Sequence, residues 1–141
     1  MVVLDTDHVT ILDRGNGDDY LRLRARLGYV PPPERLTTII TYEEQSRGWL
    51  AYVSRARTLA QQIDAYRKLN RHVTNYRKTE ILEFNEQAAM EFQRLRKLAI
   101  RVGTMDLKIA AIVLVHGAKL LSCNLVDFRR IPNLDVEDWT T

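Results

Sequence analysis

The sequence has little that would stabilise it covalently or place it in a membrane. It contains a single cysteine, Cys123, so no intramolecular disulfide can form and no oxidising compartment is required. The longest apolar run, IAAIVLV, is far shorter than the roughly 20 residues that a membrane-spanning helix needs. An aspartate stands at position 5 with no basic segment before it, which argues against a secretory signal. We therefore expect a soluble, cytoplasmic protein without membrane association.

Neither sign of charge is in large excess. The formal net charge is +3 for 141 residues, which permits a polyanionic partner without requiring one. Basic residues concentrate in RLRAR (22–26), YRKLNRH (66–72) and RLRK (94–97), and these segments are interpreted first as solvated faces of helices. A chain of this length buries well over half of its unfolded surface, so we expect one domain over residues 1–141.

Short apolar segments rich in β-branched residues alternate with longer helical segments. Buried strands are predicted at VVLD, LTTII, TEILEF, KLLSCN and LDVEDW. Helices are predicted up to about Arg14, through YLRLRARL, from Thr41 to about Lys78 with a bend near residues 54–58, after a cap at Asn85, and from a cap at Thr104 to a stop at Gly117. This alternation predicts an α/β fold with a central, mostly parallel sheet covered by helices on both faces.

Polar residues follow the predicted strands and open the predicted helices. They are Asp5 and Asp7, Glu43 and Glu44, Asp106, and the pair Asn124 and Asp127. Because the carboxyl ends of parallel strands lie at one edge of a sheet, one site could collect Asp5, Glu44, Asp106 and the Asn124/Asp127 pair. Clustered acids require a compensating cation, and all-oxygen ligation favours Mg²⁺ or Mn²⁺ over zinc. Such an ion suits phosphodiester hydrolysis.

Each of these residues also has a structural interpretation. Thr41 and Glu44 fit a capping box, and Asp106 near a helix start would favour the helix dipole. Asn124 and Asp127 could cap the turn before the phenylalanine that follows them. Asp5 is the exception, because a carboxylate directly after a buried strand has no helix to cap until a residue or two later, and it is the strongest candidate ligand.

The segments LDTDHVTIL, TTIITYEEQSRG, GTMDLKIAAIVLVHGAKLLSCNLVDFRRIP and LDVEDW resemble, in order and spacing, the PIN-domain ribonucleases of the VapC toxin type. The resemblance implies a PIN-like three-layer fold with Asp5 and Asp106 in the core metal-binding positions. It implies Glu44 as the second acid, since Glu44 stands four residues before Gly48. Asn124 takes a fourth position where many relatives carry aspartate.

The resemblance also implies further site residues and a biochemical function. Asp127, one turn beyond Asn124, is expected as a further metal ligand, and Thr6, Asp7, Thr104 and Ser122 are expected to support the site. The resemblance implies a Mg²⁺- or Mn²⁺-dependent endoribonuclease acting on structured RNA such as tRNA or rRNA. It also implies a toxin that is usually a homodimer and is inhibited by a cognate antitoxin, whose C-terminal segment occupies the active-site groove.

Two other functions fit parts of the sequence. LDTDHVT matches the opening of haloacid-dehalogenase-like phosphatases, with Asp5 as nucleophile and Asp7 as general acid and base. Such an enzyme needs a second aspartate four residues after Asp106, where this chain has Ala110. A non-catalytic PIN-like scaffold that binds RNA or a partner would be marked by loss of a core acid, and none is lost.

Three features have open or purely structural interpretations. Cys123 is expected inside a buried strand as a small hydrophobe. His8 either contacts substrate or packs as a neutral ring. The helices from Trp49 to Lys78 combine apolar and basic residues, and they fit a dimer contact, an antitoxin platform or an RNA clamp.

Overall fold

The fold is built on a single parallel sheet. It is described by a computed structural model that covers residues 1–141. Its five strands run in the order β3-β2-β1-β4-β5, and every neighbouring pair is parallel. The strands are β1 (Val2–Leu4), β2 (Arg35–Thr38), β3 (Glu80–Leu82), β4 (Lys119–Leu121) and β5 (Asp135–Glu137). After β3 the chain crosses to the other side of β1, so the topological switch point lies between β1 and β4.

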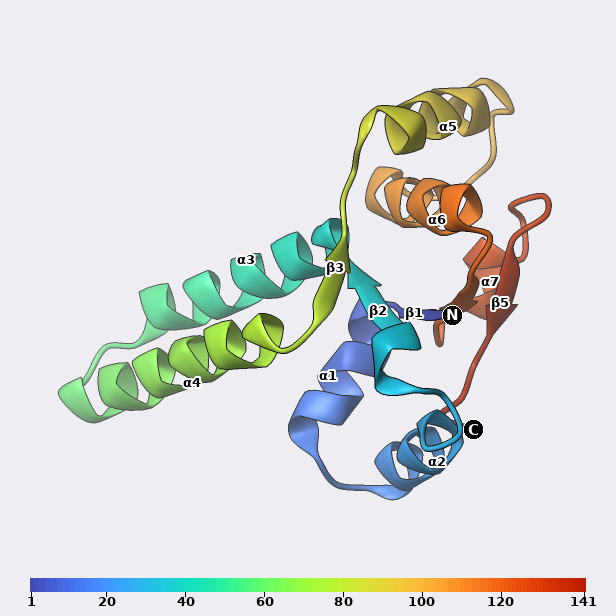
Figure 1. Ribbon diagram of the computed structural model, residues 1–141. Coiled ribbons are helices and arrows are strands. Elements are labelled where there is room, and N and C mark those ends of the chain that lie inside the picture. Colours follow the sequence, from blue (N-terminus) through green and yellow to red (C-terminus); the bar gives the residue numbers. More distant parts are fainter.

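Helices cover both faces of this sheet, which confirms the predicted three-layer α/β fold (Figure 1). The helices α1 (Thr6–Arg14) and α2 (Asp18–Leu27) lie on one face, while α5 (Glu86–Lys97) and α6 (Thr104–His116) lie on the other. Each face of the sheet has its own hydrophobic core, because successive side chains of a strand point to opposite faces. Val2 and Leu4 of β1 pack in the core beneath α1 and α2, and Val3 packs in the core beneath α5 and α6. Helix α6 is buried from Ile109 to Val113 because the sheet and α5 enclose it.

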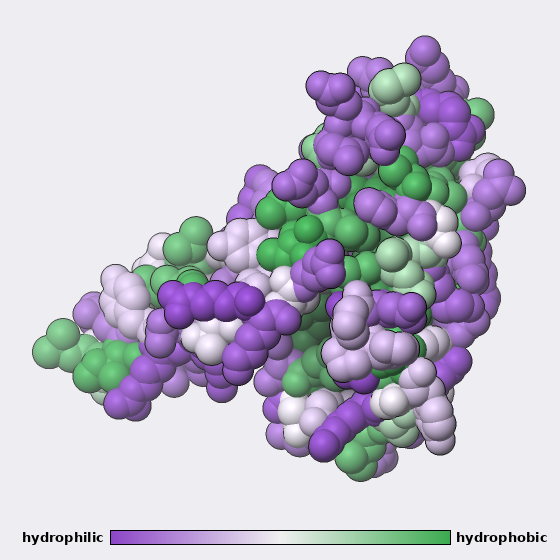
Figure 2. Space-filling model, in the orientation of Figure 1, coloured by the Kyte–Doolittle hydropathy of each residue, from purple (hydrophilic) through white to green (hydrophobic).

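A long helical hairpin projects away from the sheet (Figure 1). It consists of α3 (Ile39–Arg55) and α4 (Leu59–Arg77), which pack against each other. We call this pair the arm. A capping box at Thr58 starts α4, and stacked aromatic rings of Tyr42 and His72 hold the base of the arm together. Leu59 and Ile63 remain exposed near its far end, where Figure 2 shows a hydrophobic patch.

Some predicted boundaries are wrong, and hydrogen bonding explains the differences. Helix α3 begins at Ile39 because the Thr38 hydroxyl accepts from the Thr41 backbone N–H, so the capping box with Glu44 does not form. Gly103 rather than Thr104 is the N-cap of α6. β4 ends at Leu121, and Cys123 is exposed after it instead of packing inside a strand.

The remaining short elements complete the chain. They are a 3-10 helix η1 (Pro32–Glu34) and a one-turn helix α7 (Leu125–Phe128), which begins after its N-cap Asn124 as the capping interpretation predicted. No helix in the structure is long and apolar enough to cross a membrane.

Candidate active site

An acidic pocket of about 550 Å³ opens at the carboxyl edge of the sheet. It is lined by the predicted residues Asp5, Thr6, Asp7, Glu44, Asp106 and Asn124, together with Thr10, Ile11, Arg14 and Asp19. The chain supplies them from the end of β1, from α1, from the start of α2, from α3, from the start of α6 and from the residue before α7. The parallel topology therefore brings together side chains that lie more than a hundred positions apart in the sequence.

Asp5 is the deepest carboxylate of the pocket and is only 6% exposed. Its backbone N–H continues the β1–β4 ladder by donating to the Leu121 carbonyl at 2.9 Å. Its Oδ1 caps α1 by accepting from the Thr6 N–H at 2.8 Å, so the expectation that Asp5 has no adjacent helix to cap is wrong. Its Oδ2 accepts from the Ser122 hydroxyl at 2.7 Å. Capping and ligand binding remain compatible, because a carboxylate oxygen has more than one lone pair.

Burial and neighbouring charge both work against the ionised form of Asp5. Burial raises the pKa of Asp5 to about 7, and the negative charges of Asp7 and Asp106 add to that effect. The hydrogen bonds from Ser122 and from the Thr6 N–H oppose the rise in pKa. A group in this state gains strongly from a nearby cation.

Glu44 reaches the same pocket from α3 and carries an unpaired oxygen. The Thr6 hydroxyl donates to Glu44 Oε2 at 3.0 Å, which ties α3 to α1. Glu44 Oε1 is buried and has no hydrogen-bond partner. Burial raises the pKa of Glu44, and the charge of Asp106 adds to the rise while the Thr6 hydroxyl opposes it. Because a buried polar atom without a partner is costly, Oε1 marks a place where a ligand fits.

Asn124 bridges two acids on the opposite side of the pocket. Its Nδ2 donates to Asp106 Oδ2 at 3.3 Å and to Asp127 Oδ2 at 3.0 Å. Burial raises the pKa of Asp106, and the charge of Asp127 raises it further. The amide nitrogen therefore faces the carboxylates and offsets part of their charge. Asp127 does not line the pocket and contacts it only through Asn124.

Asp7 belongs to a hydrogen-bond network behind Asp5. It accepts from the Cys123 N–H at 2.9 Å, from the Ser122 hydroxyl at 3.3 Å and from His8 Nδ1 at 2.7 Å. Burial alone would raise the pKa of Asp7, but the hydrogen bonds from His8 and Cys123 outweigh it and the pKa is lowered. Ser122, fully buried, is thus shared by both aspartates.

His8 is a fully buried, hydrogen-bonded ring that does not line the pocket. The Trp139 backbone N–H donates to His8 Nε2 at 3.2 Å, so the ring proton must be on Nδ1, where it donates to Asp7. Asp7, His8 and Cys123 are the one set of three His, Cys, Asp or Glu residues whose ligand atoms all lie within 4.8 Å of one another. Because that proton occupies Nδ1, this set is a hydrogen-bond network and does not have the form of a metal site.

The pocket acids stand further apart and suit a hard cation better. Their donor atoms are all oxygens, one of them is buried without a partner, and three of their pKa values are raised. Mg²⁺ keeps several waters and uses only one or two carboxylates directly, so the separation does not conflict with such an ion. The residues present therefore fit a divalent cation.

Four lining residues were not predicted from the sequence, and three predicted residues, Ser122, Asp127 and Thr104, do not line the pocket. Thr10, Ile11, Arg14 and Asp19 complete the pocket wall. For Thr10 and Arg14 the signal was their i, i+4 spacing from Thr6, which places all three on one face of α1. Thr104, exposed at the first position of α6, does not line the pocket.

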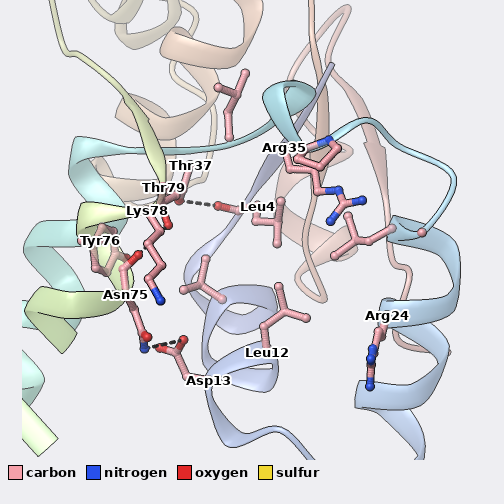
Figure 3. Close-up of a pocket in the computed structure, with 15 residues that line it drawn as sticks. Leu4, Leu12, Asp13, Arg24, Arg35, Thr37, Asn75, Tyr76, Lys78 and Thr79 are labelled. Atoms are coloured by element: carbon pink, nitrogen blue, oxygen red, sulfur yellow. Dashed lines mark hydrogen bonds between the residues drawn. The ribbon is translucent and has the colours of Figure 1, made fainter. Parts of the chain in front are cut away.

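A more enclosed cavity of about 450 Å³ lies on the α1/α2 face of the sheet (Figure 3). Leu4 and Leu12 line its apolar part, and Arg24, Arg35 and Lys78 surround it. None of the predicted site residues lines it. The more enclosed of the two cavities is therefore not the one that contains the predicted active-site residues.

The comparisons with known proteins agree with the fold. The model of the PIN domain matches residues 2–134. Two curated relatives are Ribonuclease VapC2 of Rickettsia felis, 33% identical over 64 residues, and Ribonuclease VapC1 of the same organism, 40% identical over 60 residues. These matches span 43% and 40% of the chain and only 48% and 45% of the relatives, about half of their length.

Solved structures match over almost the whole chain. VapBC-1 from nontypeable Haemophilus influenzae has a TM-score of 0.73 at 25% identity and covers 100% of both chains. VapBC2 from Rickettsia felis, bound to a DNA fragment from its promoter, has a TM-score of 0.69 at 23% identity over 99% of both chains. FitAcB from Neisseria gonorrhoeae has a TM-score of 0.73 at 18% identity over 98% of this chain and 97% of that chain. By its sequence match and its fold, the chain belongs to the PIN domain family.

Proposed function

We propose that this protein is a divalent-metal-dependent endoribonuclease and the toxin of a toxin–antitoxin pair. The observation that carries the proposal is the acidic pocket, where Asp5, Glu44 and Asp106 converge at the switch point of the sheet and Glu44 Oε1 is buried without a partner. The likeness to proteins named Ribonuclease VapC supports the reaction class. We propose structured RNA, such as tRNA or rRNA, as the substrate.

The residues divide into those that would hold the cation and those that position them. Asp5, Glu44 and Asp106 would hold Mg²⁺ or Mn²⁺, with Asp127 able to contribute through Asn124 or a water. The chemistry that such a cation supplies when bound is activation of water and neutralisation of phosphoryl charge.

The chain's own groups keep the carboxylates in place. Ser122 fixes the orientation of Asp5, Thr6 fixes that of Glu44, and Asn124 holds Asp106. These contacts fix the carboxylates in one arrangement before any ligand binds, which is the preorganisation that electrostatic catalysis needs.

Cleavage assays with matched variants test the proposal. RNA incubated with the purified protein is expected to be cut in Mg²⁺ or Mn²⁺ and to remain intact in EDTA, and Asp106→Asn is expected to abolish cutting. Asp135→Asn is the control, because Asp135 is an exposed acid on β5 outside the pocket. Full activity of Asp106→Asn, or equal activity in EDTA, would refute the proposed metal-dependent site.

The phosphatase alternative is disfavoured by the surroundings of Asp7. A general acid must exchange its proton, yet three donors contact Asp7 and its pKa is lowered. Asp7→Asn separates the two enzymes, because it would inactivate an aspartyl phosphatase while a PIN nuclease would retain cutting activity.

We also propose a cognate antitoxin and a homodimer as partners. The solved relatives include VapBC complexes, and the arm offers exposed apolar side chains such as Leu59, Ile63 and Tyr66 for a protein contact. Light scattering after size-exclusion chromatography is expected to give twice the chain mass of 16.4 kDa. A mass of 16.4 kDa at all concentrations would contradict the dimer.

A further inference from the structure

A third cavity, of about 530 Å³, adjoins the acidic pocket, and its charged lining consists of three arginines, Arg14, Arg55 and Arg71, and two acids, Asp13 and Glu44. The two share Thr6, Thr10, Arg14 and Glu44, so one continuous depression runs along α1 and α3. Along α3 the residues Glu44, Gly48, Tyr52 and Arg55 recur at helical spacing, and the face changes from acidic to basic over about 16 Å at 1.5 Å per residue. We call this third cavity the basic cavity.

Two arginines of the basic cavity are free to bind an anion. Arg55 and Arg71 are exposed and take part in no ion pair, whereas Arg14 at the boundary pairs with Asp19. Asp13 also lines the cavity, beside Arg71, and accepts from Asn75 Nδ2 at 3.2 Å. Two guanidinium groups that form no ion pair, next to the proposed phosphodiester-cleaving pocket, suit the phosphates that flank the cleaved one.

An aromatic wall stands beside these cations. The Tyr52 hydroxyl donates to Asp64 at 2.7 Å and accepts from Lys68 at 3.2 Å, and Lys68 also lies over the Tyr52 ring. Tyr52 in turn contacts Trp49 edge to face, with ring centroids 5.8 Å apart. Tyr52 is thus held from several sides and supports Trp49, the ring that no cation covers. A supported, partly exposed indole is a suitable platform for a nucleic-acid base.

Gly48 between the acids and the aromatic wall has no structural reason to be glycine. It lies inside α3 with ordinary helical backbone, and a Cβ built there would meet nothing within 4 Å. Glycine inside a helix lowers helix stability relative to alanine, so neither packing nor conformation accounts for it. A glycine that lines a cavity lets a ligand approach the backbone closely.

We propose, on the basis of the ribonuclease function above, that the basic cavity binds an unpaired nucleotide of the RNA next to the cleaved phosphate. The base stacks on Trp49, the adjoining phosphates pair with Arg55 and Arg71, and the sugar-phosphate chain passes over Gly48. The walls are fixed before binding, because Gln45 accepts from Tyr76 at 2.5 Å and donates to Thr10 at 3.3 Å, which joins α4, α3 and α1.

Binding measured without cleavage tests this subsite. The probe is a short fluorescein-labelled oligouridylate in EDTA, and anisotropy gives its affinity. Trp49→Ala is expected to weaken binding by roughly 5- to 100-fold, the range for loss of one stacked base, while Trp49→Phe retains most of the affinity. Arg71→Gln is expected to lower the slope of log affinity against log salt by about 0.7, as for one lost phosphate contact. Arg57→Gln is the matched control, an exposed arginine at the tip of the arm outside the cavity.

A second readout identifies the stacked base. Oligouridylate is expected to quench the tryptophan fluorescence of the wild type. This quenching is expected to disappear in Trp49→Phe, which assigns it to Trp49. An abasic oligonucleotide of the same length is expected not to quench. Affinities of Trp49→Ala and Arg71→Gln that equal those of the wild type and Arg57→Gln would overturn the proposal. Tighter binding of a polyglutamate peptide that depends on the same arginines would overturn it in favour of an acidic protein segment.

The two proposals fail separately. Cleavage in Mg²⁺ that is indifferent to Trp49 and Arg71 would leave the nuclease function standing and refute the subsite. Base-dependent quenching by a protein that cuts no RNA would refute the nuclease and leave a nucleotide-binding subsite.

Discussion

Replacing Asp5 by asparagine is expected to stabilise the metal-free protein at neutral and alkaline pH. The pKa of Asp5 is about 7 in the folded protein and near 3.8 when exposed, so the folded state holds a proton that the unfolded state releases between these values. Stability associated with Asp5 is therefore present at low pH and is lost as pH rises through this window. At about 1.4 kcal/mol per pH unit the loss reaches roughly 4 kcal/mol above pH 7, as a ceiling for one coupled group.

The structure indicates that asparagine fits at this position. The Thr6 N–H can still donate to the amide oxygen, and the Ser122 hydroxyl can turn to accept from the amide nitrogen while donating to Asp7. The substitution therefore removes charge without removing hydrogen bonds. A chain of this size shifts in Tm by about 3 °C per kcal/mol, which places the gain at up to about 12 °C near pH 8.

Thermal unfolding of the wild type and Asp5→Asn in EDTA, between pH 4.5 and pH 8, measures this difference. The Tm gap is expected to be small at pH 4.5 and to widen towards pH 8. Added Mg²⁺ is expected to narrow the gap by stabilising the wild type more than the variant. A Tm gap that does not change with pH would contradict the raised pKa of Asp5. Equal stabilisation of both proteins by Mg²⁺ would contradict its role as a cation ligand.

Three further substitutions follow from the same contacts. Ser122→Ala leaves both aspartates without a shared donor, and we expect at least tenfold lower kcat in RNA cleavage together with about 1–3 kcal/mol lower stability in urea unfolding. Gly48→Ala should raise stability by about 1 kcal/mol in the same unfolding assay while weakening oligouridylate binding, and a variant that binds normally would contradict the close approach. Ile112→Ala, inside α6, should cost about 2–5 kcal/mol in urea unfolding, and a cost below 1 kcal/mol would contradict its full burial.

The fold could be predicted from the sequence because its signals are local. VVLD and KLLSCN are apolar and β-branched, and the helices between the strands carry regular apolar spacing, so the alternation fixes a parallel sheet. Boundaries were less predictable, since several adjacent residues can cap. Thr38 and Thr41 are equally good caps by type, and Thr38 is used because β2 ends there and its hydroxyl meets the Thr41 N–H.

The candidate site was partly predictable, for a topological reason. Parallel strands end on one edge, so residues after β1 and β4 had to meet, and Asp5 and Ser122 do. The orientation of Asn124 towards two acids was not predictable, because it depends on how α6 and α7 pack in space. The ligand roles of these residues stay a prediction. The basic cavity was not predictable for a similar reason, because Arg71 lies on α4 and lines the cavity only once α4 packs against α3.

Asp5 and Asp7 stand two residues apart yet have opposite pKa shifts, and this separates their roles. Burial and like charges raise the pKa of Asp5, while hydrogen bonds from His8 and the Cys123 N–H lower that of Asp7. Carboxylates whose surroundings push their pKa values apart are suited to different tasks. Asp7 stays ionised as an acceptor that anchors the β1 and β4 ends through Ser122 and Cys123. Asp5 faces the pocket with a charge that only a proton or a cation can balance, which is the property that a first metal ligand requires.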